Sequence, residues 1–190
     1  MLLNGNNKIT RARTAKDCAL LAVFVSVVIV AQVCLSVLAG VEVVTVLFVA
    51  YSYASGWKKA TFAATAFTLV RQIIFGFFPT VLILYLIYYN LLAVTFGVLG
   101  QKLPETKGRG WLITAIACVG TVCFTMLDNV LTPLWYGYSA RATQLYFTAS
   151  LSVLIPQVVC TAVSVSCLFS PLFRIFKRFF SENFTFRLTS

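Results

Sequence analysis

Residues 72–101 read QIIFGFFPTVLILYLIYYNLLAVTFGVLGQ and contain no charged side chain. A helix of about 20 apolar residues crosses the hydrocarbon core of a bilayer, so this run is too long for one crossing. Gly76 and Pro79 mark a turn within it, because proline disfavours continuation of the helix before it. The stretch therefore predicts two membrane-spanning helices joined as a hairpin, at about 60–78 and 81–100.

The composition of the whole chain is that of a membrane protein. Its 190 residues are 60% hydrophobic and 11% charged, whereas a soluble domain has roughly a quarter of its residues charged. The net charge of +10 does not indicate nucleic-acid binding, because the basic residues fall in short gaps between apolar stretches. The six cysteines lie inside apolar stretches, so we expect packing roles, with no disulfide framework and no zinc site.

Four further apolar stretches complete the predicted fold. The first follows a basic segment and is longer than a signal-peptide core of about 7–15 residues, so we expect it to remain as a permanent span. The last contains Pro156, where we expect a kink, and we expect it to end at Pro171. The fold class is therefore all-α integral membrane, a bundle of six transmembrane helices. Its predicted segments are 1–17 (basic, cytoplasmic), 18–39, 43–55, 60–78, 81–100, 111–129, 146–170 and 171–190 (basic, cytoplasmic tail), with 43–55 the weakest span.

The distribution of basic residues tests this count. Six spans place the basic residues of 1–17, of Lys58 and Lys59, of the loop at 101–110 and of 171–190 on one side. Of the basic residues between spans, only Arg141 falls on the other side. Cytoplasmic loops are enriched in Lys and Arg, so we predict that both termini are cytoplasmic and that the chain lies in a cell membrane.

Ionisable side chains within spans are costly and are therefore candidate functional residues. Arg71 lies in the third span, and Glu42 and Asp128 lie at the outer ends of the second and fifth, so all three are expected at one depth. We expect an outward-facing polar pocket, although an arginine–carboxylate bridge that only orients helices is the alternative. The candidate substrate-binding residues are Gln32, Glu42, Arg71, Gln72, Asn90, Asp128, Asn129, Trp135 and Tyr136.

Some polar and aromatic residues near the expected pocket have a structural alternative. Asn90 and Gln157 lie near the middle of the membrane, where they would reach the floor of the pocket or form interhelical hydrogen bonds. Trp135 and Tyr136 belong to an aromatic-rich connection expected at 130–143, and would form either a lid or an interfacial aromatic belt.

The chain lacks the residues that several kinds of catalysis and metal binding require. The chain has no histidine, which excludes histidine-based metal sites and histidine-activated nucleophiles. It has neither a Walker A motif nor a GxGxxG loop. We therefore expect no cofactor, no metal and no enzymatic activity.

The chain resembles the S component, or substrate-binding subunit, of prokaryotic energy-coupling factor (ECF) transporters. The resemblance rests on the basic N-terminus, the six helices, and the segments 40–45 (GVEVVT), 55–60 (SGWKKA) and 85–90 (YLIYYN), which are similar to those of a group whose substrate is uncharacterised. It implies capture of a vitamin or related micronutrient outside the cell. It also implies delivery by toppling after docking on a transmembrane coupling protein driven by two ABC-type ATPases.

The resemblance further implies a docking face of small residues on the first helix, matched in this chain by Ala15, Ala19, Ala22 and Ser26. The lack of histidine argues against the nickel- and cobalt-transporting members. A self-sufficient carrier or channel for a small solute is the alternative, although the chain has no internal repeat. An intramembrane enzyme ranks third, because few nucleophiles and bases are available at one depth.

Overall fold

The computed structural model of the chain describes residues 3–35, 43–103 and 108–185, and these residues form six α-helices and no strand. The helices are α1 (Leu3–Leu35), α2 (Val44–Ser55), α3 (Trp57–Phe75), α4 (Pro79–Lys102), α5 (Gly110–Tyr136) and α6 (Ala140–Thr185). Four of them are long and apolar enough to cross a membrane: α1 over Ala15–Leu35, α4, α5, and α6 over Ala140–Phe180. The all-α prediction is confirmed, and the four helices are compatible with a multi-pass membrane protein.

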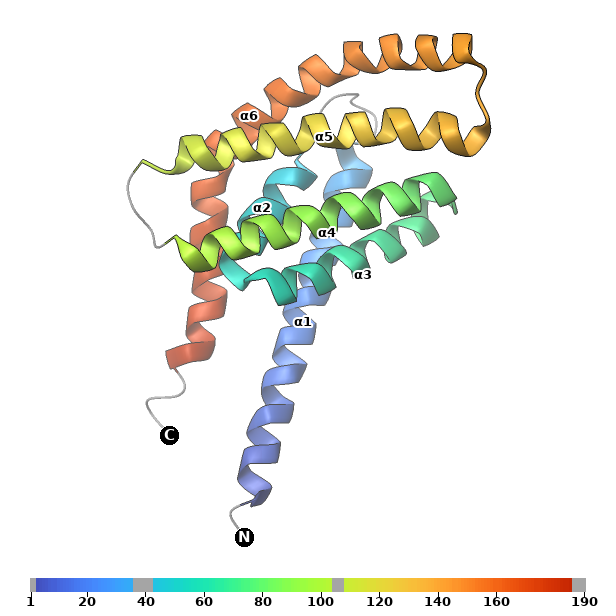
Figure 1. Cartoon of the computed structure of the whole chain (residues 1–190). Coiled ribbons are helices and arrows are strands. Elements are labelled where there is room, and N and C mark those ends of the chain that lie inside the picture. Colours follow the sequence, from blue (N-terminus) through green and yellow to red (C-terminus); the bar gives the residue numbers. More distant parts are fainter. Residues whose placement is uncertain (1–2, 36–42, 104–107, 186–190) are drawn as a thin grey trace.

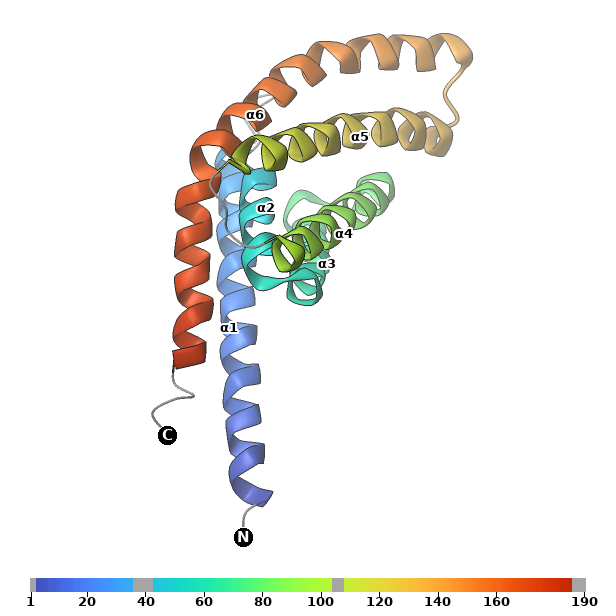
Figure 2. The same ribbon diagram turned by 60° about the vertical axis from the view of Figure 1, so that its left-hand side comes forward.

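Two hairpins organise the fold (Figure 1). Gly76, with a positive φ of 96°, connects α3 to α4, and Gly137, with a φ of 61°, ends α5 before the turn into α6. Figure 2 shows that the first part of α6 follows α5, whereas its C-terminal part turns to run beside α1 and α2. The start of α1 and the end of α6 therefore lie on the same side of the molecule.

Several helix ends differ from the predictions, and α3 lies at Trp57–Phe75 rather than 60–78. α1 begins at Leu3 rather than near residue 18, α5 continues through Pro133 to Tyr136, and α6 begins at Ala140. The prediction that Pro171 ends the last helix is wrong, since α6 continues to Thr185.

Aromatic contacts explain why α6 continues past Pro171. Phe173 packs edge-to-face on Tyr53, with ring centroids 5.3 Å apart, and Phe176 packs on Tyr51 at 5.6 Å. Such ring pairs stabilise a helix that a proline would otherwise weaken. The phenylalanines predicted in a tail thus belong to the packed structure.

The short helix α2 lies at the centre of the fold. Its 12 residues extend about 18 Å, less than the roughly 30 Å of a bilayer core, yet ten of them are buried. α4 approaches it closely: a Cβ on Gly100 would lie 2.3 Å from the Tyr53 backbone oxygen, and one on Gly97 would lie 2.4 Å from the Trp57 Cα. The turn between α2 and α3 therefore packs on α4 backbone to backbone.

Candidate functional site

A cavity of about 390 Å³ lies between α5 and α6. Its size falls in the range of ligand pockets, roughly 300–1,000 Å³. Asp128 is its charged residue, and its polar residues come from both helices. The lining residues are Phe124, Thr125, Asp128, Tyr146, Ala149, Ser150, Val153 and Gln157, which we call the α5–α6 pocket.

The path of α6 makes room for this pocket. Thr121 and Thr161 share a hydrogen bond of 3.1 Å at one end of the pocket, and Tyr146 donates to Asp128 at 2.7 Å toward the other. Between these two contacts α5 has about two turns, whereas α6 has about four turns. The longer segment of α6 cannot follow α5 closely along its whole length. α6 contains Pro156 in this interval and diverges from α5 toward the turn at Gly137 (Figures 1 and 2).

Asp128 is hydrogen-bonded only by neutral groups. Its Oδ1 accepts from the Thr132 hydroxyl at 2.8 Å, and its Oδ2 accepts from the Tyr146 hydroxyl. No described Lys or Arg forms an ion pair with it. A carboxylate oxygen has two lone-pair sites, so each oxygen retains capacity for a further donor.

Arg71 lies in a second polar group, between α1, α3 and α4. Its guanidinium lies over the Tyr85 ring at 4.3 Å and the Phe75 ring at 5.1 Å. Its Nε and Nη1 are buried and have no hydrogen-bond partner among the described residues. Gln32 donates to the Tyr85 hydroxyl at 3.2 Å, and the Gln72 side-chain oxygen accepts from the Phe78 backbone N–H at 3.0 Å.

An aromatic wall connects the two groups. Tyr85 contacts Phe124, which lines the α5–α6 pocket, with ring centroids 5.9 Å apart. The sequence predicts Arg71, Glu42 and Asp128 around one pocket. In the structure Arg71 packs on Tyr85 and Phe75, whereas Asp128 accepts hydrogen bonds from Thr132 and Tyr146. Glu42 lies outside the described residues.

The other predicted substrate-binding residues differ in their hydrogen bonds and exposure. Asn90 accepts from Thr65 at 3.4 Å and donates to the Leu86 carbonyl, which matches the interhelical alternative. Asn129 is buried, and both its side-chain polar atoms lack a hydrogen-bond partner among the described residues. Trp135 and Tyr136 are more than half exposed at the end of α5, and neither lines the α5–α6 pocket.

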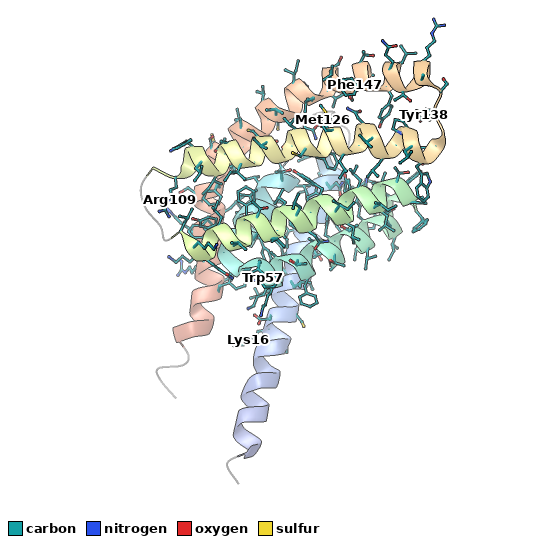
Figure 3. All side chains as sticks on the ribbon, viewed as in Figure 1. Lys16, Trp57, Arg109, Met126, Tyr138 and Phe147 are labelled. Carbon is teal, nitrogen blue, oxygen red and sulfur yellow. The ribbon has the colours of Figure 1, made fainter. Side chains whose placement is uncertain are left out.

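The sequence analysis missed most of the α6 side of the pocket. Tyr146, Ser150, Val153 and Gln157 follow one another at spacings of four, three and four residues, which places them on one face of a helix. The helical spacing of these four residues could have identified them from the sequence, but the sequence analysis included only Gln157. Figure 3 shows Phe147 on α6, and Tyr138 at the turn, at the end of the α5–α6 hairpin opposite Arg109.

The predicted docking residues share an unpacked face. Ala15, Ala19, Ala22 and Ser26 are all exposed, whereas Phe24 and Val28 on the same helix are buried against the core. The small-residue face of α1 is therefore open to a partner or to lipid.

No protein-family model, no curated protein and no solved structure matches the chain.

Proposed function

We propose that the chain is the membrane-embedded substrate-capture subunit of an ECF-type importer. It would bind a vitamin or related micronutrient in an outward-facing pocket and deliver it by docking on a coupling protein with two ABC-type ATPases. The observation that carries this proposal is the α5–α6 pocket, a ligand-sized cavity lined by the carboxylate of Asp128 and two aromatic rings.

In this proposal the chain crosses a prokaryotic cytoplasmic membrane six times, with both termini in the cytoplasm. The arrangement of the connections supports this orientation. Figure 3 places Trp57, next to Lys58 and Lys59, and Arg109 toward the ends of the helices opposite Tyr138. The pocket then opens on the side with fewer basic residues, as a receptor for an external solute requires.

The exposed small-residue face of α1 supports a docking role. Small side chains allow the backbones of two membrane helices to approach closely, and Ala15, Ala19, Ala22 and Ser26 are exposed in the described part of the chain. A coupling protein would cover this face, whereas the buried face with Phe24 would keep α1 attached to α2.

The experiment is to coexpress the chain with the coupling proteins of its own cell, purify it in detergent, and identify retained proteins and small molecules by mass spectrometry. We expect a coupling protein, two ATPases and a micronutrient to remain bound. Ala19→Leu should release the proteins while the ligand stays bound, and Ala115→Leu at an exposed position of α5 serves as a control outside the docking face.

A chain that transports a solute in liposomes without ATPases would overturn the proposal and favour the self-sufficient carrier.

Arg71→Ala tests whether the Arg71 group takes part in ligand binding. If the Arg71 group contributes to binding, the variant loses the micronutrient; if it only packs on Tyr85 and Phe75, the ligand stays bound.

A further inference from the structure

We infer that the α5–α6 pocket selects a singly charged organic cation, a protonated amine or amidine carried on an apolar, ring-sized body. This inference rests on the proposed capture function and names the class of its substrate. It starts from the unbalanced charge of Asp128.

An ionised carboxylate at membrane depth is costly unless a cation or a sufficient set of donors balances it. Asp128 has two neutral donors, Thr132 and Tyr146, and no basic partner among the residues the structure describes. The two hydroxyls fix the orientation of the carboxylate without cancelling its charge. A bound cation would supply the missing charge.

The hydrogen-bonding capacity of Asp128 indicates what kind of cation fits. Each of its oxygens uses one of two acceptor sites, so both can accept from an N–H of a ligand. Hydrogen bonds between charged partners are the strong ones, about twice as strong as neutral pairs. An ammonium or amidinium provides such N–H groups, whereas a quaternary ammonium does not.

The walls of the pocket fit an apolar body next to this charge. Phe124 and Tyr146 present rings, and Ala149 and Val153 present aliphatic surface. Ring faces attract a cation as well as an apolar group. The wall is also firmly held, since Phe124 packs on Tyr88 with ring centroids 4.7 Å apart.

Gln157 provides a second polar contact away from Asp128. It lines the pocket, is 9% exposed, and forms no hydrogen bond with any described residue. An amide that lines the pocket without a partner among the described residues can pair with a ligand group that both donates and accepts. The expected ligand therefore has a cationic end at Asp128 and a neutral polar group at Gln157.

The test uses three probes that differ mainly in charge: 2-phenylethylamine, 2-phenylethanol and 3-phenylpropanoate. Each is added to the purified full-length chain in detergent, and its affinity is measured by isothermal titration calorimetry. We expect the amine to bind and the other two to bind at least about tenfold more weakly, since a charged hydrogen bond contributes about 1.5–3 kcal/mol. Equal or stronger binding of the alcohol or the acid, or no binding of any probe, would overturn the inference.

The matched variants are Asp128→Asn, which keeps the shape and removes the charge, and Asp17→Asn, which removes a carboxylate outside the pocket. Asp128→Asn should lose the preference for the amine, and Asp17→Asn should keep it. Tyr146→Phe removes one donor and leaves the charge, so it should also keep the preference. An amine preference that survives Asp128→Asn contradicts the inference, and the three probes on the unaltered chain decide the matter if that variant does not fold.

These results are separable from the proposed function. A retained micronutrient that is neutral or anionic would refute the cation while leaving capture intact. Amine selectivity in a chain that retains no coupling protein would refute capture while leaving the cation site intact.

Discussion

The contact between α2 and α4 and the hairpin of α5 and α6 are built in opposite ways. In the first, Gly100 lets the α4 backbone meet that of Tyr53, Gly97 lets it meet the turn at Trp57, and ten of the 12 residues of α2 are buried. In the second, hydrogen bonds and an extensive contact join the helices, yet a cavity of about 390 Å³ lies between them. The first region is suited to be the fixed part of the molecule, and the second to receive a ligand.

The most apolar candidate span of this fold is not its most buried helix. The segment Ala15–Leu35 is the most apolar candidate span and is mostly exposed, whereas α2 is too short for a typical span and is almost fully buried. In lipid, an apolar side chain gains little by moving from acyl chains into protein, so close packing of small residues decides which helices are central.

The largest effect is expected from breaking the contact of α4 with the turn between α2 and α3. An alanine at Gly97 would place its Cβ 2.4 Å from the Trp57 Cα and backbone nitrogen, and neither backbone can move without displacing a helix. We expect Gly97→Ala to destabilise the protein by about 3 kcal/mol, the upper part of the range for overpacking. Thermal unfolding in detergent and gel filtration measure this loss.

Gly120→Ala is the matched control for that variant. Gly120 is also inside a helix, but its Cβ would meet only the Tyr88 side chain, at 3.9 Å. We expect unchanged or slightly higher stability, because alanine favours a helix over glycine by about 1 kcal/mol. Equal unfolding midpoints for the two variants would contradict the close approach of α4 to the turn between α2 and α3.

Much of the fold could be predicted from the sequence because its signals are local. The uncharged run at 72–101, interrupted by Gly76 and Pro79, gives the α3–α4 hairpin. The central place of α2 could not be predicted, because it depends on glycines of α4 that are distant in sequence. The helical continuation past Pro171 depends similarly on rings of α2 that contact Phe173 and Phe176.

The second prediction concerns the opening of the α5–α6 hairpin. Pro156 lies on α6 between the two hydrogen bonds that bracket the pocket, and a proline inside a helix removes a backbone hydrogen bond and bends the helix. Pro156→Ala should let α6 straighten against α5 and shrink the cavity. We expect ligand binding to weaken by about 1 kcal/mol, roughly fivefold, in the calorimetric titration.

Pro171→Ala is the control, since this second proline of α6 lies outside the bracketed interval. It should leave the affinity unchanged. If both substitutions weaken binding equally, the effect comes from α6 as a whole, and a specific role of Pro156 in opening the pocket is refuted.

The site could also be predicted only in part, because the sequence shows local charge but not the contacts between helices. The sequence identifies Arg71 and Asp128 as costly residues that need partners, because charge is visible at each position. It does not reveal that Arg71 packs on Tyr85 while Phe124, in contact with Tyr85, lines the pocket with Asp128, since ring packing depends on how helices rotate. The α6 stripe that contains Tyr146 and Gln157 was visible but lacks charge.

The third prediction measures how firmly the narrow end of the hairpin is held. Thr121 and Thr161 are fully buried and share a hydrogen bond of 3.1 Å. Thr121→Val, Thr161→Val and the double variant form a cycle whose coupling should be about 0.6 kcal/mol, typical of polar pairs in membrane proteins. Unfolding in mixed micelles gives the three differences, and a coupling of zero would show that apolar packing alone closes this end.

The smallest effect is expected where α1 meets α3. Lys59 donates to Asp17 at 2.7 Å, but the two side chains are 43% and 41% exposed, so solvent screens the pair. Asp17→Asn should lower stability by at most about 0.5 kcal/mol, and the difference should vanish at high salt. Lys59 also lies over the Phe180 ring of α6, at 5.4 Å, and this contact remains in the variant. A loss that persists at high salt, measured by thermal unfolding in detergent, would mean that Asp17 holds α1 in place by more than charge, and that the exposed α1 belongs with the fixed part of the molecule.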